Sequence, residues 1–373
     1  MTNHQRTVLI AGGGLAGLTS AYLLHREGIG FELFEARDRL GGRVMSLDAS
    51  GNPAAEGFDL GPSWFWPQLQ PRMAEFVEAL GLTTFAQNSE GDVLFHRMSR
   101  EAPQRYRGMA QEAQSMRLVG GTGALIAALA ASLPAHCLHI GARVTALHLR
   151  EDGVEAALSK PDGNERMARG AYALLAAPPR LLEAAMSFFP ALPPATAGLW
   201  RAIPTWMAPH AKFLALYDRP FWREAGLSGT AQSMAGPMME IHDATTASGQ
   251  AALFGFLGVP TAQRSVAGEA AITAACVQQL ALLFGPEAGM PRATLFKDWA
   301  ADKLTATAAD QIAGGHPAAG VHNWVDGAWA QRLLLAGSET SPLEPGYLAG
   351  AVEAAIRAVA ELRRRIREEK EDN

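Results

Sequence analysis

The chain begins with two short, largely apolar runs separated by a glycine-rich turn and a helix-like segment. Thr7–Ala11 and Phe31–Phe34 have the composition of buried parallel strands. Between them, Leu15–Glu27 carries apolar residues at helical spacing and is followed by Gly28, which can close a helix. The pattern predicts a strand–helix–strand unit and therefore a doubly wound parallel sheet.

Further apolar patterns predict the elements that follow. Helices are expected near Met73–Leu80 and from Thr122 onward. Alternation over residues 142–152 and 154–160, with a turn between them, favours a hairpin that returns to the main sheet.

The second half of the chain is more mixed. It contains a predicted strand at Ala211–Tyr217 and a predicted Ala/Leu-rich helix at Gly268–Phe284. The end of the chain predicts a strand, a loop and a long helix starting near Tyr347 that rejoins the first domain. We therefore expect an α/β protein with a discontinuous first domain (residues 1–75, 115–195 and 315–373) and an inserted mixed α+β second domain (residues 76–114 and 196–314).

Length and charge narrow the class of protein. With 373 residues, the chain exceeds the size of a single hydrophobic core. A formal net charge of −5 provides no basic field for nucleic acid and no patch for anionic lipid. No apolar stretch is long enough to span a bilayer, and Val8–Ala11 is too short for a signal-peptide core. We expect a protein without nucleic-acid or membrane partners that acts on a small molecule.

Cysteine and histidine positions give no sign of a metal site or a disulfide framework. Cys137 and Cys276 are far apart in sequence, and no acid or cysteine joins the histidine pairs at ligand spacing (His136 and His139, His316 and His322). We expect no metal, and free cysteines are consistent with a reducing cytoplasm.

Gly12, Gly14 and Gly17 form a G-x-G-x-x-G motif between a predicted strand and a predicted helix. In this context the backbone of the turn, with Leu15 and Ala16 after it, is expected to bind a pyrophosphate at the helix N-terminus. Glu35 ends the second strand, where a carboxylate accepts hydrogen bonds from a ribose 2′-OH and repels a 2′-phosphate. The alternative is a glycine turn of another α/β sheet with a solvated glutamate.

The sequence Glu35–Arg43, EARDRLGGR, resembles the hallmark E-A-x-x-R-x-G-G-R of the flavin-containing amine oxidase family. The resemblance continues in family order through DLGPSW (59–64), GGTGAL (120–125), AKFLALYDRPFW (211–222) and LAGSETSPLEPGYLAGAVEAA (335–355). It covers nearly the whole chain and is specific for the family, but much less so for the substrate.

The resemblance implies a Rossmann-like FAD-binding domain, which would be the discontinuous one, and an inserted substrate-binding domain. For Arg37, the alternative interpretation is a solvated surface charge. For Gly337, the alternative is a simple turn residue. Beyond the glycine motif and Glu35, the residues implied to bind FAD are Ala36, Arg37, Gly42, Arg43, Gly61, Pro62, Ser63, Trp64, Val144, Gly337, Ser338, Glu339, Tyr347 and Leu348.

Three side chains are implied to act in catalysis. The matching lysine of the family reaches flavin N5 through a water, so Lys212 is expected to promote electron transfer to O2; a lysine reaching solvent from an edge strand is the alternative. Tyr347 and Trp64 are expected to form walls of the amine site. The backbone at Leu348, at the start of the last helix, is expected to stabilise negative charge on the reduced flavin.

The chain also departs from the family pattern. No cysteine follows Trp299, so FAD is expected to be noncovalent, and Leu304 falls near the position of the second cage tyrosine. Trp299 and Leu304 are expected to contact substrate, with a core position as the alternative for Trp299. The connection from Pro71 to Gly120 is short, so the pocket is expected to be open or completed by a partner chain in a homodimer.

Taken with the resemblance, these residues predict an FAD-dependent oxidase that converts an amine to an imine and reduces O2 to hydrogen peroxide. The Leu304 position further predicts a larger or more apolar amine. Two alternatives remain open: a desaturase or dehydrogenase of the same superfamily that uses another electron acceptor, and a flavin-binding scaffold with little turnover.

Overall fold

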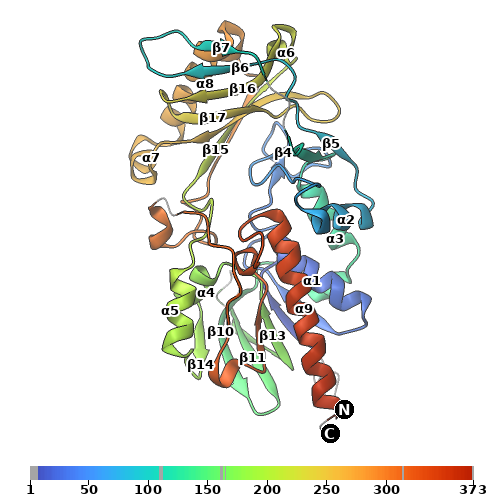
Figure 1. Cartoon of the computed structure of the whole chain (residues 1–373). Coiled ribbons are helices and arrows are strands. Elements are labelled where there is room, and N and C mark those ends of the chain that lie inside the picture. The colour runs from blue at the N-terminus through green and yellow to red at the C-terminus, as the bar shows by residue number, and fades with distance from the viewer. Residues whose placement is uncertain (1–6, 109–111, 160–162, 164, 313–314, 372–373) are drawn as a thin grey trace.

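The structure is a computed structural model that describes residues 7–108, 112–159, 163, 165–312 and 315–371. Two large sheets occupy opposite ends of an elongated molecule, and both chain ends lie at the end formed by the smaller of these sheets (Figure 1). The chain crosses between the two ends several times, so each half is built from separate stretches of sequence.

The first half contains a five-stranded parallel sheet in the order β20-β13-β1-β2-β9. Its strands are β1 (Val8–Ala11), β2 (Phe31–Phe34), β9 (Leu138–His139), β13 (Tyr172–Leu175) and β20 (Leu333–Leu335). Helix α1 (Leu15–Arg26) connects β1 to β2. The predicted strand–helix–strand unit and the doubly wound α/β fold are confirmed, with the helix ending one residue earlier than predicted.

Both faces of this sheet are buried. Val8 and Ile10 of β1 pack in one core with the helices α1, α2 (Pro71–Ala79), α3 (Gly123–Ala131) and α9 (Leu348–Glu371). Leu9 and Ala11 pack in a second core on the opposite face, together with α4 (Pro179–Ala185) and α5 (Pro194–Ala202). Burial on both faces explains why β1 has no polar position.

The predicted hairpin exists, but it does not join the main sheet. It forms its own four-stranded sheet in the order β12-β11-β10-β14. The strands are β10 (Arg143–Arg150), β11 (Gly153–Ser159), β12 (Glu165–Gly170) and β14 (Ser187–Phe189). Its apolar face packs against the parallel sheet, and only the next strand, β13, returns to that sheet. Residue 160, the last of the predicted hairpin, lies outside the described residues.

The second half contains a seven-stranded sheet in the order β19-β15-β18-β17-β16-β6-β7. Its strands are β6 (Asp92–His96), β7 (Gln104–Tyr106), β15 (Ala211–Tyr217), β16 (Leu227–Ser233), β17 (Met238–Asp243), β18 (Ala251–Leu257) and β19 (Ala293–Asp298). The long helix α8 (Glu269–Phe284) packs on one face of it. Because β15 pairs on both sides, Lys212 does not lie on an edge strand.

Smaller elements complete the fold. They include the strand pairs β3 (Ser46–Leu47) with β4 (Phe58–Asp59) and β5 (Thr84–Ala86) with β8 (Met116–Leu118), and the short helices α6 (Phe221–Glu224) and α7 (Thr261–Ala267).

The predicted domain boundaries at residues 75 and 195 fall inside α2 and α5. Both helices pack with the first half, through Met73 and Val77 of α2 and Trp200 of α5. A helix buries its apolar stripe as one unit, so the chain leaves the first half only after each helix has ended.

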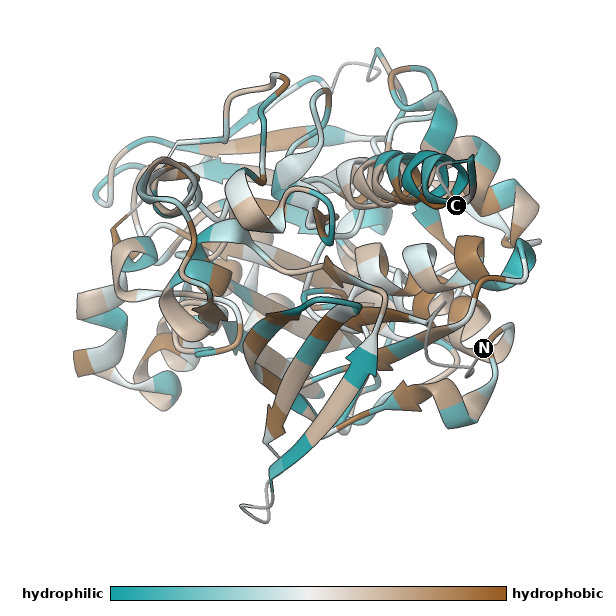
Figure 2. Ribbon diagram, turned by 90° about the horizontal axis from the view of Figure 1, so that it is seen from below, coloured by the Kyte–Doolittle hydropathy of each residue, from teal (hydrophilic) through white to brown (hydrophobic). Residues whose placement is uncertain are grey.

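Hydrophobic residues are concentrated in the central strands, whereas α9 becomes hydrophilic toward its C-terminal end (Figure 2). Over the described part of the chain, no single helix has the length and apolar composition needed to cross a membrane. Helices α7 and α8 meet these two requirements only when taken together, and the pair is bent by 104°. Within the same residues, no three His, Cys, Asp or Glu side chains gather in a way that could hold a metal ion.

Candidate functional site

A cavity of about 630 Å³ lies between the two large sheets. Its walls include the carboxyl ends of β1 and β2, the start of α9, and residues of β15, β17 and β18. Ligands of doubly wound sheets bind at the carboxyl ends of the strands, and cofactor sites have volumes of about 300–1,000 Å³. The cavity therefore has the position and size of a cofactor site that continues into a second region lined by the seven-stranded sheet.

Gly12 and Gly14 of the glycine motif line the cavity. A Cβ atom on Gly17 would lie 1.9 Å from the carbonyl oxygen of Gly12, so the first turn of α1 packs directly on the loop. A Cβ atom on Gly14 would meet no atom closer than 3.8 Å, which leaves its backbone open to a ligand. No acidic residue lies in the first turn of α1, so its N-terminus is suited to an anion.

The Glu35 carboxylate is buried and held by the backbone. Its Oε2 accepts a hydrogen bond from the Gly13 N–H at 2.7 Å, and its Oε1 accepts one from the Arg37 N–H at 2.8 Å. A carboxylate has about four lone-pair sites, so both oxygens retain capacity for ribose hydroxyls. This arrangement fits the adenosine half of a dinucleotide without a 2′-phosphate.

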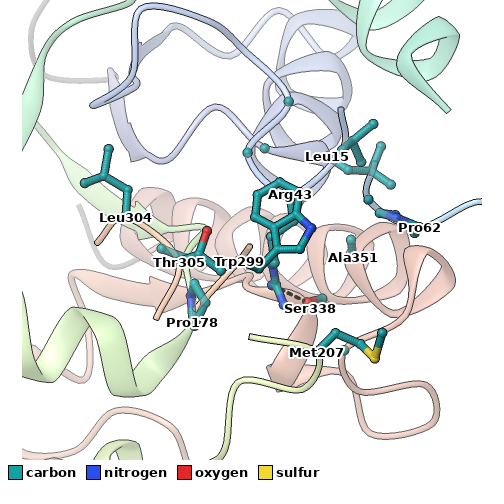
Figure 3. Close-up of a pocket in the computed structure, with 18 of the residues that line it drawn as sticks. Leu15, Arg43, Pro62, Pro178, Met207, Trp299, Leu304, Thr305, Ser338 and Ala351 are labelled. Carbon is teal, nitrogen blue, oxygen red and sulfur yellow. Dashed lines mark hydrogen bonds between the residues drawn. The ribbon is translucent and has the colours of Figure 1, made fainter. Parts of the chain in front are cut away.

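Arg43 faces the cavity from the loop after β2, next to residues from the end of the chain. Its Nη2 donates to Ser338 Oγ at 3.0 Å, and its Nη1 lies 2.6 Å from Glu339 Oε1 (Figure 3). The buried Glu339 fixes the guanidinium at the cavity wall, where it can also donate to phosphate oxygens.

The start of α9 is a second helix N-terminus at the cavity. Leu348 lines the cavity, and the first turn contains no acidic residue. The first N–H groups of a helix have no partner within the helix, and its dipole makes this end positive. The arrangement can stabilise negative charge on a bound group.

Lys212 is only 2% exposed, although it carries an ammonium group. Its Nζ donates to Ser63 Oγ at 2.7 Å and to the Gly61 carbonyl at 3.1 Å, and it lies 4.0 Å from the centre of the Phe254 ring. Burial lowers the pKa of Lys212, the nearby Asp59 carboxylate partly opposes this shift and Arg117 adds to it, and the resulting pKa is about 7. The lysine therefore changes charge near neutral pH.

Aromatic rings surround Tyr347. The ring centre of Tyr347 lies 4.7 Å from that of Trp206, 5.1 Å from that of His316 and 6.2 Å from that of Trp66. On another side of the cavity, Trp64 is fixed by a 2.8 Å hydrogen bond from its Nε1 to Gln87 Oε1. These rings form an apolar wall that attracts cations.

Most of the predicted site residues line this one cavity. They are Gly12, Gly14, Leu15, Ala16, Glu35, Ala36, Arg37, Gly42, Arg43, Gly61, Pro62, Ser63, Trp64, Val144, Lys212, Trp299, Leu304, Ser338, Tyr347 and Leu348. Gly17, Gly337 and Glu339 instead lie behind the wall, where Gly337 approaches the Ala177 backbone and Glu339 pairs with Arg43.

The sequence matches the family of flavin containing amine oxidoreductases over residues 97–363, and an NAD(P)-binding Rossmann-like domain over residues 10–80. The chain belongs to the flavin containing amine oxidoreductase family.

Curated relatives include an L-amino acid dehydrogenase of Synechocystis, which is 30% identical over 65% of this chain and 50% of its own length. A probable flavin-containing monoamine oxidase A of Dictyostelium discoideum is 23% identical over 95% of this chain and 97% of the relative. The chain thus spans about half the length of the first relative and nearly all of the second.

Solved structures of similar fold include a putrescine oxidase bound to putrescine, with a TM-score of 0.77, 19% identity, and coverage of 96% of this chain and 99% of the other. A cyclohexylamine oxidase from Brevibacterium oxydans has a TM-score of 0.78, 20% identity, and coverage of 97% and 99%. At these identities the likeness establishes the fold.

The structure places Leu304, which was expected to contact substrate, on the side of the cavity next to Arg37. The neighbours of Leu304 in sequence, Asp302 and Thr305, hydrogen-bond to Arg37 beside Glu35. Leu304 therefore lines the cofactor part of the cavity, on the opposite side of the view from Met207 (Figure 3). Among the rings that surround Tyr347, that of Trp206 lies closest, so an aromatic ring stands beside Tyr347 in this cavity.

Trp299 is both buried in the core and part of the cavity wall. It is 6% exposed and donates from Nε1 to the Leu60 carbonyl at 2.9 Å, yet it also lines the cavity. Its core position and its place in the cavity wall are therefore compatible.

The lining residues that sequence reasoning missed include Trp206, Met207, His210 and Glu240. The first three lie in the segment that connects α5 to β15, which carries no motif. Glu240 lies in PMMEIHD, where a bulge in β17 shifts the register and obscures the alternation. Its cross-strand pairing with Phe256, known only from the fold, is the signal that finds it.

Replacing Glu35 with glutamine should raise the Kd for FAD about tenfold, because a neutral amide binds hydroxyl donors more weakly than a carboxylate. Titration of the apoprotein with FAD, followed by flavin fluorescence, measures this. Glu32→Gln in β2, just before Glu35, is the matched control, because Glu32 pairs with His139 and does not line the cavity. Equal affinities for all three proteins would contradict the assigned role of Glu35.

Proposed function

We propose that the protein binds FAD noncovalently and oxidises an amine with O2, forming an imine and hydrogen peroxide. Water then converts the imine to a carbonyl compound and ammonia or a smaller amine. The observation that carries the proposal is the position of Lys212: its buried Nζ binds Gly61 and Ser63, which belong to the cofactor part, and it lies beside Phe256 of the second part.

FAD would supply the hydride acceptor and pass the electrons to O2. The residues of this chain hold and polarise the reaction site. Gly14, Glu35 and Arg43 would bind the adenosine diphosphate half, and the N-terminus of α9 at Leu348 would stabilise negative charge that develops on the flavin. Protonated Lys212 would favour electron transfer to O2, since superoxide carries a negative charge.

The second part of the cavity supports a cationic substrate. Lys212, Phe256 and Glu240 face one another in a single row across β15, β18 and β17. Adjacent strands lie about 4.8 Å apart, so Glu240 lies about 10 Å from Lys212 along the row. Glu240 lines the cavity with its side chain 49% exposed, and its carboxylate bonds to His242 Nε2 at 2.7 Å.

We infer from this row that the substrate carries a second cationic group, as a diamine does. Glu35 and Glu240 are the two acids that line the cavity among the described residues, and Glu35 belongs to the cofactor part. Glu240 is therefore the carboxylate that would bind a second ammonium. A structure of similar fold contains putrescine, which has two amino groups, and this likeness supports the inference.

A dehydrogenase acting on an amino acid is the second candidate, because one relative is named an L-amino acid dehydrogenase. Glu240 argues against it, since a substrate carboxylate near this acid would be repelled. Arg37 and Arg43 belong to the cofactor part, beside Glu35 and Ser338, so they would serve FAD rather than a substrate carboxylate in the second part. Consumption of O2 during turnover distinguishes the oxidase from the dehydrogenase.

The purified protein should be yellow, and acid or heat should release its FAD into the supernatant. Neither Cys137 nor Cys276 lines the cavity, and the segment after Trp299 contains no cysteine. Mixing the yellow protein anaerobically with monoamines, diamines and amino acids should bleach the flavin with an amine. Flavin retained in the precipitate would contradict noncovalent binding, and a panel that leaves the flavin oxidised would contradict amine oxidation.

A further inference from the structure

One segment of the second half closes the cofactor part of the cavity. Residues 299–311, here called the strap, follow β19 and contribute Trp299, Leu304 and Thr305 to the lining. Gln311 Nε2 donates to the Ala300 carbonyl at 2.8 Å, which ties the two ends of the strap together. The strap is therefore a compact unit that contacts the cavity along one side.

Asp302 fastens the strap on the side of β2. Its Oδ1 accepts a hydrogen bond from Arg37 Nη2 at 2.9 Å, and its Oδ2 accepts one from Lys297 Nζ at 3.0 Å. The same Arg37 nitrogen donates to Thr305 Oγ1 at 3.0 Å. The side chains of Arg37 and Asp302 are only 12% and 13% exposed, so solvent and salt screen this contact weakly.

Asp310 fastens the strap on the side of β13. Its Oδ1 accepts a hydrogen bond from Arg180 Nη1 of α4 at 2.6 Å, and its Oδ2 accepts the Thr307 N–H and hydroxyl at 2.9 and 2.8 Å. The backbone N–H of Thr205 also points to Asp310 Oδ1, at 3.3 Å. The Asp310 side chain is 1% exposed, so this anchor is more deeply buried than the first.

The two anchors lie on opposite sides of the phosphate loop. Arg37 follows β2 and Arg180 follows β13, and these two strands flank β1, which leads into Gly12. The strap therefore bridges from one neighbour of β1 to the other, across the end of the strand where the dinucleotide would bind. In Figure 3, Thr305 of the strap is drawn beside Pro178, the residue just before α4, and both line the cavity.

We propose that Asp302 and Asp310 are positioning residues that hold the strap over the bound FAD, so that FAD enters and leaves only when the strap opens. This inference rests on the proposed FAD binding. It gives the protein a way to retain its cofactor without a covalent bond. Removing the charge of either aspartate would leave its arginine, which is only 12% or 14% exposed, without a charged partner in the closed state, so each substitution should favour opening.

The test compares FAD exchange rates of the parent with those of Asp302→Asn and Asp310→Asn. Dissociation is followed by transfer of FAD from the holoprotein to an excess of a second FAD-binding apoprotein, and association by fluorescence quenching when FAD is mixed with the stripped protein. Loss of one charge-assisted hydrogen bond should make opening about tenfold more frequent. Both rate constants should therefore rise about tenfold, while the Kd for FAD changes much less.

Glu224→Gln is the matched control, because Glu224 forms an exposed ion pair with Arg219 outside the cavity. Its rates should equal those of the parent. Thr305→Val removes a hydrogen bond to Arg37 without changing charge and should raise both rates by a smaller factor, which guards against misfolding of the aspartate variants.

Two results would contradict the proposed role of the strap in FAD exchange. A rise in the dissociation rate alone would make Asp302 and Asp310 supports of an ordinary cofactor contact, and unchanged rates in both variants would remove them from FAD exchange altogether. A parent protein that binds no FAD would instead contradict the proposed function, and with it the role proposed for the strap.

Discussion

Replacing Lys212 with methionine should slow the reoxidation of the reduced flavin by O2 about 100-fold, while reduction by the amine changes only a few-fold. Methionine has nearly the same length, so the buried site between Ser63, Gly61 and Phe254 stays filled. It lacks the positive charge that would stabilise superoxide as it forms. Stopped-flow absorbance measures the two half-reactions separately.

The same lysine should make reoxidation dependent on pH. Burial lowers its pKa to about 7, so the ammonium is present below this pH and is lost above it. Reoxidation by O2 should therefore slow as the pH rises through about 7 in the parent, and Lys212→Met should lose this dependence.

Lys303→Met provides the control, since Lys303 is exposed and does not line the cavity. It should leave both half-reactions unchanged. If Lys212→Met slows both half-reactions equally, or neither, the lysine does not act in the oxygen reaction.

Replacing Glu240 with glutamine should lower kcat/KM for putrescine about 10- to 100-fold and leave that for butylamine nearly unchanged. The reason is the loss of one hydrogen bond between a carboxylate and the distal ammonium, a contact that butylamine cannot make. Glutamine preserves the size of the side chain and can still accept a hydrogen bond from His242. Steady-state oxygen consumption with the two amines measures the ratio.

The strand pairing provides a control for Glu240. Gln232 lies directly opposite Glu240 on β16, in the same cross-strand row but outside the cavity lining. Gln232→Ala should therefore leave kcat/KM unchanged for both putrescine and butylamine. A parent protein that prefers butylamine, or a Glu240→Gln variant that loses both activities equally, would contradict a second cation site.

The parts of this protein that the sequence determined are those set by local patterns. Strand β1, the glycine turn, α1 and β2 are contiguous, and each has a composition that suits one local structure. Gly12, Gly14 and Glu35 are brought together by this unit alone, because neighbouring parallel strands place their carboxyl ends at one edge. The family motif also located Lys212, whose burial follows from its apolar strand.

The tertiary structure alone decided the second part of the cavity. Glu240, Phe256 and Lys212 lie on three strands, and only the pairing order of those strands places them in one row. The side of the cavity that Leu304 lines was also not readable from the sequence, because the path of a loop is set by its anchors, here Arg37 on Asp302. Sequence spacing defines neighbours within a helix or strand, whereas the direction of a loop and the order of strands depend on contacts with distant residues.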